Sequence, residues 1–493
     1  MALNTTLTLR LTGRASAPWS LWLSSGTAVN PIPGVGTVWL DAASPALGEL
    51  AAGAFPAGTG STASVLSIPV PNDPNLLAFE AYLQALVVDP TAPSGVGLTR
   101  CVRIDLENQD SFTPVGSMSG SRALGSADLL PDGRVLVAGG GSGTLTSAVG
   151  SATCEAYNPL TRAFSPVASM STQRAFHTSV TLSDGRVMVI GGADGAGLVT
   201  ATAEIYNASN NTWTLAAPMS SPRAAHTATL LANGKILVAG GVSSFSSPAG
   251  STTPLGDILG TSQDTGEVYD PALNTWTPVT NIMASKRFAA TATRMNDGRV
   301  VIVSGLNGTG SLLGAEVPSW TNTVSIYNPT LNSFTAGPNI SLARTGHRAT
   351  LMPNGEVFVS GGFAPTLLFG ILTGVTSTNS AVKLNATGTA WSAAGTMAAG
   401  ALLHGQVLLK NGKAHLSGGS TVTLAGTTLT TSSIANCGTR LGAATAITAT
   451  NPLPAARGSH FAVRMFDGSV LIAGGSDATG AALGDCLLYT PAP

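Results

Sequence analysis

The chain has 493 residues, of which only 10% are charged, against roughly 25% in an average soluble protein. Its formal net charge of −1 excludes a basic surface that follows a nucleic-acid backbone and a polybasic patch that binds a membrane surface. The longest apolar stretch, residues 363–375, is too short for a transmembrane helix and contains Pro and Gly, so we expect no membrane insertion.

The residues after Met1 are polar and strand-like, and they lack the basic and apolar regions of a secretory signal. The low charge and the abundance of Gly, Ser, Thr and Ala nevertheless resemble the composition of secreted bacterial proteins. We therefore expect a secreted or cell-surface protein whose numbering starts at the mature end.

Residues 1–109 alternate apolar and polar side chains over short spans that are separated by Pro and Gly clusters. This pattern predicts a small β-sandwich of about seven strands. The run over residues 67–90 resembles an uncharacterised β-domain of secreted bacterial proteins, and the resemblance implies no activity. We expect this domain to span residues 1–109 and a second domain to span residues 110–493.

From residue 122 onward the sequence repeats a fixed pattern seven times. Each copy has an Asp-Gly or Asn-Gly pair, which favours a type I′ turn between two strands. Gly-Gly follows seven residues later, with Ser304-Gly305 as the one variant, and an arginine stands ten residues before the turn in every copy except the one with Ala401. The turns begin at residues 132, 184, 233, 297, 354, 411 and 467, and the arginines are Arg122, Arg174, Arg223, Arg287, Arg344 and Arg457.

Each copy predicts four strands. The first lies between the arginine and the turn, and the second runs from the turn to Gly-Gly and is almost entirely apolar, so we expect both of its faces to be buried. The third is centred on a tyrosine, or on Leu384 or Arg440 in two copies, and the fourth on a Trp, Phe or Ile seven residues later. The tyrosines are Tyr157, Tyr206, Tyr269, Tyr327 and Tyr489.

Gly-Gly, then Tyr, then Trp, then Met-x-x-x-Arg-x-x-His resembles the kelch repeat, over roughly residues 111–493. The resemblance implies an all-β fold, a seven-bladed β-propeller with four-stranded blades. Only four residues follow Tyr489, so blade seven lacks its fourth strand. Residues 111–117 have the pattern of that strand, and we expect them to complete blade seven, which closes the ring and removes an open sheet edge.

The copies differ in length only between Gly-Gly and the tyrosine position, a connection of 15 to 29 residues. Variation confined to one class of connection predicts that it carries function. These connections in blades three to five contain large apolar residues, which cap the propeller or pack on the N-terminal domain, form a patch for a partner or for self-association, or contact lipid. The interface candidates are Phe245, Leu259, Trp320, Leu367, Leu368, Phe369 and Ile371.

Five copies place a histidine three residues after the arginine position. Kelch propellers bind ligands on the face that bears these segments, so the resemblance implies contacts at the mouth of the central channel. The alternatives are that Arg and His are repeat residues bonding neighbouring blades, or that two or three histidines bind Zn or Cu. The candidate ligand contacts are Arg174, His177, Arg223, His226, Arg287, Arg344 and His347.

The galactose oxidase family uses the same histidine position as a copper ligand, together with a Tyr ligand and a Tyr–Cys cross-link. Here the residue before each histidine is Phe176, Ala225, Gly346, Leu403 or Ser459, and never Tyr. This departure argues against copper-radical chemistry, and we predict no catalytic residues, no metal and no cofactor.

Three of the four cysteines, Cys154, Cys437 and Cys486, stand three residues before the tyrosine position in blades one, six and seven. Packed sheets lie about 10 Å apart, whereas a disulfide needs Cα atoms within about 7 Å. We therefore do not expect these three to pair with one another, and the partner of Cys101 stays open.

Together these observations favour a non-catalytic extracellular protein with a binding or structural role. It would use the variable-loop face of blades two to five to hold another protein, a glycan or a second copy of itself as a homo-oligomer. The alternative is a metal- or carboxylate-dependent carbohydrate-active enzyme on the same face, although no pair of loop carboxylates stands out by its spacing.

Overall fold

The computed structural model describes residues 110–491 except 143–148, 245–261, 313–314, 369–370, 426–427, 443 and 445, together with nine strands in the first 105 residues. The regular elements in these parts of the chain are all strands. They include no helix long and apolar enough to cross a membrane. The chain divides into two compact units, mainly Met1–Ser111 in one and mainly Phe112–Asn158 and Arg162–Tyr489 in the other.

The nine N-terminal strands pair into three sheets. β2 lies between β5 and β7, β7 also pairs with β8 and β9, β1 pairs with β6, and β3 pairs with β4. These pairings do not by themselves arrange the sheets into two packed layers, so the sandwich stays a prediction. The strands are β1 (Thr6–Arg14), β2 (Pro18–Ser24), β3 (Thr27–Ile32), β4 (Gly36–Leu40), β5 (Gly48–Ala54), β6 (Ser61–Pro69), β7 (Glu80–Val88), β8 (Val96–Leu98) and β9 (Val102–Asp105).

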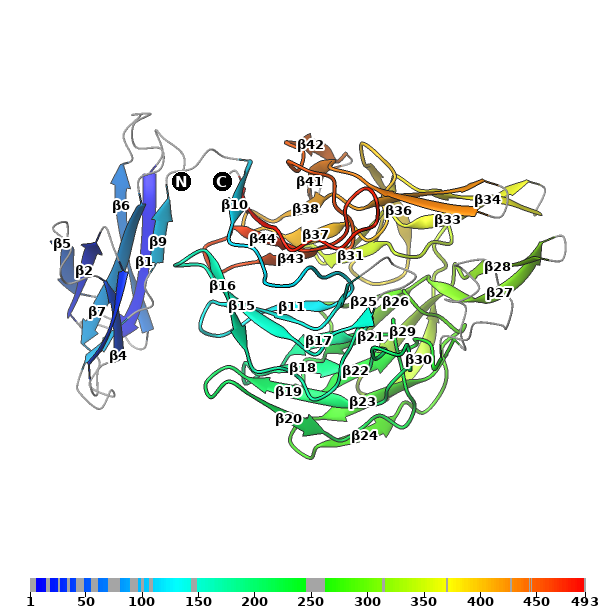
Figure 1. The fold of residues 1–493 in the computed structure, drawn as a ribbon, viewed down its shortest axis with the longest axis horizontal. Coiled ribbons are helices and arrows are strands. Elements are labelled where there is room, and N and C mark those ends of the chain that lie inside the picture. The colour runs from blue at the N-terminus through cyan, green and yellow to red at the C-terminus, as the bar shows by residue number, and fades with distance from the viewer. Residues whose placement is uncertain are drawn as a thin grey trace. The chain divides into compact units, whose positions relative to one another are not determined.

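The second unit confirms the predicted seven-bladed propeller, with four antiparallel strands in every blade (Figure 1). Blade 1 consists of β11 (Ser126–Leu129), β12 (Val135–Ala138), β15 (Cys154–Asn158) and β16 (Ala163–Val167). Blade 2 consists of β17 (Thr178–Thr181), β18 (Val187–Ile190), β19 (Ala203–Asn207) and β20 (Thr212–Ala216). Blade 3 consists of β21 (Thr227–Leu230), β22 (Ile236–Ala239), β23 (Gly266–Asp270) and β24 (Thr275–Pro278).

The remaining four blades follow the same order. Blade 4 consists of β25 (Thr291–Arg294), β26 (Val300–Val303), β29 (Val324–Asn328) and β30 (Ser333–Gly337). Blade 5 consists of β31 (Arg348–Leu351), β32 (Val357–Ser360), β35 (Ser380–Leu384) and β36 (Trp391–Thr396). Blade 6 consists of β37 (Gly405–Leu408), β38 (Lys413–Ser417), β41 (Cys437–Leu441) and β42 (Thr448–Thr450). Blade 7 consists of β43 (Phe461–Arg464), β44 (Val470–Ala473), β45 (Cys486–Thr490) and β10 (Ser111–Val115).

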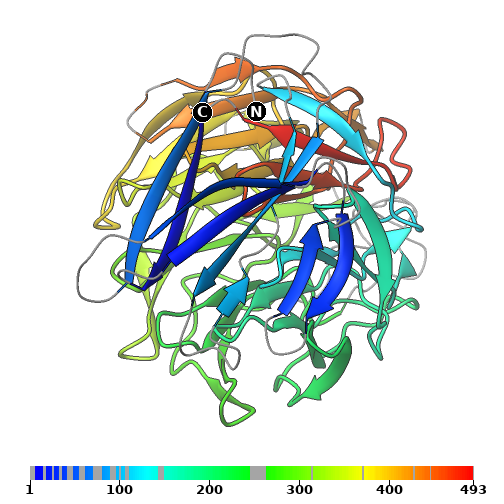
Figure 2. The same cartoon turned by 90° about the vertical axis from the view of Figure 1, so that its left-hand side faces the viewer.

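The ring closes as the sequence predicts, because β10 pairs with β45 and becomes the fourth strand of blade 7. The first strands of neighbouring blades contact one another around the whole ring, including β43 of blade 7 with β11 of blade 1. The chain thus runs once around the propeller, and its colours follow one another from cyan through green and yellow to red (Figure 2). At the closure, the rings of Phe112 and Tyr489 lie 5.0 Å apart.

Apolar layers fill the space between adjacent blades. The second strand is fully buried in every blade but blade 6, where only Lys413 is partly exposed. One cluster joins Met188 and Ile205 of blade 2 to Ile236 and Val238 of blade 3. The burial of these alternating faces on both sides of each sheet is the main source of stability in such a ring.

The glycine pair that ends each second strand is required by a close approach of the chain. Gly191 has a φ of 60°, and a Cβ atom added there would lie 2.2 Å from the carbonyl oxygen of Arg223. In blade 4, Ser304 occupies this position, and its Oγ donates to the carbonyl of Thr321 and accepts from the backbone N–H of Arg344. The serine side chain therefore finds hydrogen bonds within the same tight space.

Four of the variable connections contain β-hairpins, where the sequence suggested only loops. They are β13 (Gly141–Ser142) with β14 (Val149–Gly150), β27 (Leu306–Leu312) with β28 (Ala315–Trp320), β33 (Phe363–Leu368) with β34 (Ile371–Ser377), and β39 (Ser420–Ala425) with β40 (Thr428–Ser433). Strand β34 also pairs with β39, so blades 5 and 6 share a four-stranded sheet, the hairpin sheet, of order β33-β34-β39-β40. Figure 1 shows β27, β28 and β34 extending beyond the blades.

The closure of the ring predicts a specific loss of stability. Replacing the half-buried Phe112 by alanine removes its packing against Tyr489, so we expect Phe112→Ala to lower the free energy of unfolding by about 2–3 kcal/mol in urea denaturation. The control is Leu215→Ala on the outer strand of blade 2, where the side chain is 68% exposed and the expected change is below about 0.5 kcal/mol. Equal losses of unfolding free energy in the two variants contradict a stabilising role for Phe112 in the closing strand.

Candidate functional site

The repeated arginine occupies the interior of its own blade. In blade 2, Nη1 of Arg174 donates to the carbonyls of Gly191 and Thr202 at 2.8 and 2.9 Å. Its Nη2 donates to Oγ1 of Thr202 and to Oε1 of Glu204 at 2.8 and 3.0 Å. The guanidinium therefore joins the end of the second strand to the start of the third, beside the backbone hydrogen bond from the N–H of Gly191 to the carbonyl of Thr202.

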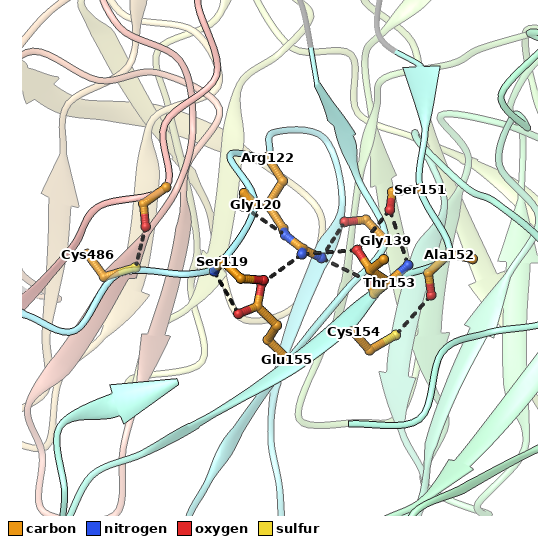
Figure 3. Close-up of polar contacts among 11 residues, drawn as sticks. Ser119, Gly120, Arg122, Gly139, Ser151, Ala152, Thr153, Cys154, Glu155 and Cys486 are labelled. Atoms are coloured by element: carbon orange, nitrogen blue, oxygen red, sulfur yellow. Dashed lines mark hydrogen bonds and ion pairs between the residues drawn. The ribbon is translucent and has the colours of Figure 1, made fainter. Parts of the chain in front are cut away.

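The carboxylate partner recurs in blades 1, 2, 3 and 7. In blade 1, Nη2 of Arg122 lies 2.8 Å from Oε1 of Glu155, whose Oε2 accepts the backbone N–H of Ser119 (Figure 3). Blade 3 has the pair Arg223–Glu267 at 3.2 Å, and in blade 7 Arg457 pairs with Asp485. The glutamates thus serve as scaffold residues, in line with their repeated position.

Blades 4 to 6 depart from this arrangement. Arg287 and Arg344 are buried against carbonyl and hydroxyl oxygens with no carboxylate, and burial lowers their pKa to about 10. Blade 6 has Ala401 in place of the arginine and Gly438 in place of the glutamate. Blades 1 to 3 therefore carry a buried ion pair, in blade 7 the carboxylate of Asp485 is 52% exposed, and blades 4 to 6 have lost one or both partners.

The histidines link neighbouring blades. Nε2 of His177 lies 3.1 Å from Oγ of Ser126 in blade 1, and Nε2 of His226 lies 2.8 Å from Oγ1 of Thr178 in blade 2. His347 makes the same contact with Thr291 at 2.9 Å. Burial is the largest cause that lowers the pKa of these three imidazoles to about 3, so they are neutral at physiological pH.

The structure places the candidate ligand contacts inside the blades. The side chains of Arg174, Arg223, Arg287 and Arg344 are at most 1% exposed, and those of His177, His226 and His347 at most 6%. Their polar atoms are directed at the backbone and at hydroxyl groups of the repeat. This geometry favours the alternative in which Arg and His hold the propeller together, and it gives no support to direct ligand contacts.

The inner mouth of the ring is formed by the residue two positions after each repeat arginine, or after Ala401 in blade 6. The sequence pattern did not single out these residues. All seven have φ between 49° and 64°, although only one is glycine. Their backbones bond in sequence, for example from the N–H of Ala225 to the carbonyl of Phe176 and from the N–H of Ala289 to the carbonyl of Ala225. The seven are Leu124, Phe176, Ala225, Ala289, Gly346, Leu403 and Ser459.

An apolar cluster covers this inner ring. Phe288, Leu306, Phe363, Val375, Leu402 and Val422 are buried in it, and Phe176, Leu403 and Trp320 pack at its margin. The rings of Trp320 and Phe363 meet edge to face at 5.7 Å. Among the interface candidates, Trp320 thus contributes to capping the propeller.

The other interface candidates divide into two groups. Leu367, Leu368 and Ile371 lie on the β33–β34 hairpin, where Leu367 opposes Leu372 and Leu368 opposes Ile371. Phe245, Leu259 and Phe369 lie outside the described residues. The structure therefore assembles the blade 5 candidates at one end of the hairpin sheet, and it leaves the choice between capping and partner binding open for them.

A buried carboxyl group lies on the innermost strand of blade 1. Oδ1 of Asp128 accepts a long hydrogen bond of 3.4 Å from Thr181, and its Oδ2 is buried with no hydrogen-bond partner among the described residues. Burial raises the pKa of Asp128 to about 6. No sequence pattern pointed to this group, because Asp128 stands within an ordinary strand pattern.

Cys154, Cys437 and Cys486 are free and buried, in agreement with the expectation that they do not pair. Each Sγ donates to the carbonyl two residues earlier, as for Cys154 and Ala152. Burial raises the pKa of all three thiols to about 11, so they are unreactive packing groups.

Residues 174–220 and 223–283 match the Kelch motif family. Similar solved structures include a novel fungal alcohol oxidase of the AA5 family in complex with copper, at 20% identity over 77% of this chain and 76% of that chain, with a TM-score of 0.55. Another is YjhT, at 17% identity over 68% of this chain and 99% of that chain, with a TM-score of 0.49. No curated protein matches the sequence. At these identities the oxidase likeness shows the fold alone.

The histidines of this chain do not fit a copper site. Their Nε2 atoms are directed at hydroxyl groups of the neighbouring blade and not toward a common point. In the parts of the chain that the structure describes, no three His, Cys, Asp or Glu residues gather as metal ligands. The donor set needed for copper chemistry is therefore not assembled by these residues.

The buried ion pair of blade 2 predicts a strong coupling. We expect Arg174→Met and Glu204→Leu each to destabilise the protein by about 3–5 kcal/mol, because each leaves a buried charge without its partner. The double variant should lose far less, since it replaces both charges by apolar groups. A double-mutant cycle in urea measures the coupling, and additive single effects contradict it.

The neutral histidines predict an acid-sensitive ring. The unfolded chain takes up protons near pH 6.5 and the folded chain only near pH 3, so stability is complete above pH 6.5 and falls as the pH drops toward 3. In urea denaturation between pH 7 and 4.5, we expect His226→Asn to show a shallower loss of stability than the wild type. Parallel pH profiles of the two proteins contradict this role of His226.

Proposed function

We propose that this chain, a seven-bladed kelch propeller, is a non-catalytic extracellular binding or structural protein that associates with a second protein chain through its hairpin sheet. The kelch propeller fold supports a protein-binding or structural role. The low charge and the Gly, Ser, Thr and Ala bias support an extracellular location. A second copy of the same chain is the partner that we favour.

The hairpin sheet carries the proposal. Its strands β33, β34, β39 and β40 contain no charged residue. Natural proteins protect exposed edge strands with charges, prolines or bulges. The β33 edge has Pro365 and a bulge beside Thr366, whereas β40 has neither in its sequence Thr-Leu-Thr-Thr-Ser-Ser.

An unprotected edge of this kind favours strand addition. A partner strand gains main-chain hydrogen bonds along β40, while side chains on alternate positions give specificity. Antiparallel pairing of β40 with β40 of a second copy makes the same patch face itself across a two-fold axis, which is the commonest symmetry of soluble oligomers. The edge therefore fits self-association without a separate partner.

Light scattering of the purified chain tests this proposal. We expect a mass that is a multiple of 49.2 kDa and that returns to 49.2 kDa when Asn-Gly replaces residues 424–429, which shortens β39 and β40 beyond the opposed pair Thr423 and Thr430. The same replacement of residues 367–373, beyond Thr366 and Gly374, shortens β33 and β34 on the opposite edge and should leave the oligomer intact.

The control for a nonspecific apolar effect is Leu198→Ser, which removes a 68% exposed leucine from the connection of blade 2 and should leave the mass unchanged. A wild-type chain that stays at 49.2 kDa at all concentrations refutes self-association. An oligomer that survives the shortening of β39 and β40 refutes the β40 edge as the interface.

A further inference from the structure

Blade 6 has lost the buried arginine together with its carboxylate. Ala401 stands at the arginine position and Gly438 at the position of Glu155, Glu204 and Glu267. Ile447 also replaces the Trp or Phe of the fourth strand. Three positions that hold Arg, Glu and Trp or Phe in blades 1 to 3 thus all carry smaller side chains in blade 6.

The space that these side chains fill elsewhere is a cavity of about 200 Å³ in blade 6. Ala401, Gly438 and Ile447 all line it, so the cavity coincides with the three reduced positions. Met397 and Leu416 add buried apolar walls, and the rim includes the exposed residue Asn436. The site is therefore closed at its base and accessible from its rim.

The backbone that surrounds an arginine in the other blades is kept in blade 6. In blade 5, Nη1 of Arg344 donates to the carbonyls of Gly361 and Ser380 at 3.1 and 2.9 Å. The corresponding residues of blade 6 are Gly418 and Asn436, and both line the cavity. The N–H of Gly418 bonds to the carbonyl of Asn436 at 2.8 Å, as that of Gly361 bonds to Ser380 at 3.2 Å.

The cavity thus retains the acceptors of a guanidinium site without the guanidinium. The carbonyl of Gly418 accepts no hydrogen bond from the described residues, whereas its counterpart Gly361 accepts from Arg344. Asn436 stands at the repeat position of Ser380, whose hydroxyl accepts from Arg344 in blade 5. These oxygen atoms favour a ligand that presents several N–H donors in one plane.

The absence of a carboxylate does not prevent such binding in this protein. Arg287 and Arg344 are held by carbonyl and hydroxyl oxygens only, in the two blades that precede blade 6. Both side chains are at most 1% exposed. The chain therefore already holds two guanidinium groups by the same kinds of hydrogen-bond acceptor that line the blade 6 cavity.

We propose that the blade 6 cavity binds the guanidinium group of a ligand, which hydrogen-bonds to Gly418 and Asn436 while its alkyl chain packs against Met397, Leu416 and Ile447. The ligand is a small alkylguanidine or the arginine side chain of a partner, which share this chemistry. It enters from the rim, so its guanidinium takes the place that the repeat arginine reaches from the base in other blades.

Calorimetric titration of the full chain with butylguanidinium tests the site, at concentrations far below those that denature proteins. We expect one bound ligand per chain, with butylammonium and the neutral butylurea binding at least about ten-fold more weakly. Agmatine and N-acetylarginine amide then separate the two sources, since only a site that takes a partner's arginine accommodates the flanking amides of the second compound.

Two variants locate the binding. Ala401→Arg restores the repeat arginine and should abolish binding of butylguanidinium, and Ala401→Met fills the cavity without a charge and should also abolish it. As a matched control, Arg344→Ala empties the arginine position of blade 5, which like blade 6 has no carboxylate partner, and should raise the stoichiometry from one to two. Absence of binding to the wild type, or binding that neither Ala401 variant changes, overturns the proposal.

Discussion

The propeller depends on one interaction, the hydrogen bonding of a buried arginine to carbonyl groups at the ends of its own blade's strands. The second strand ends at a glycine pair and the third begins a few residues before its tyrosine. There the carbonyl of Thr202 accepts the N–H of Gly191, whereas the carbonyl of Gly191 accepts no backbone N–H from the described residues, and the arginine donates to both carbonyls. An unpaired buried carbonyl is costly, and a guanidinium has enough donors to satisfy several at once. The same requirement explains why the glycine pair and the arginine keep a constant spacing while the connection between the glycine pair and the tyrosine varies.

That interaction divides the ring into two parts. Blades 1, 2, 3 and 7 keep the arginine with a carboxylate, whereas blades 4 and 5 keep only the arginine and blade 6 keeps neither. The long hairpins rise from blades 4, 5 and 6. Among the described residues, the blades that depart from the repeat are thus also those with the long hairpins, whereas the hairpin of blade 1 has strands of only two residues.

The repeat spacing predicted the number of blades, their four strands and the closing strand, because each of these follows from a strict backbone geometry that only a few residue types permit. The N-terminal strands have no such repeat, so the sequence pattern did not predict how their sheets pack. The hairpin sheet was missed because strands such as Thr428–Ser433 lack an alternating pattern, and the pairing of β34 with β39 joins the connections of two different blades. The left-handed backbone at Phe176 and Ala225 could not be predicted from the sequence either. Neither residue type favours that conformation, and the backbone hydrogen bonds around the ring hold it in place.

The blade 6 cavity shows how a departure from a pattern becomes informative. Ala401 and Gly438 are separate exceptions in the sequence, and their connection emerges only when other blades show that the two positions touch. Loss of one partner leaves a buried charge unpaired, whereas loss of both leaves a neutral space with its backbone acceptors in place. In blades 1 to 5 and 7 the repeat arginine occupies this space and bonds to the equivalent carbonyls, so among the described blades only blade 6 leaves these acceptors to a group from outside the repeat.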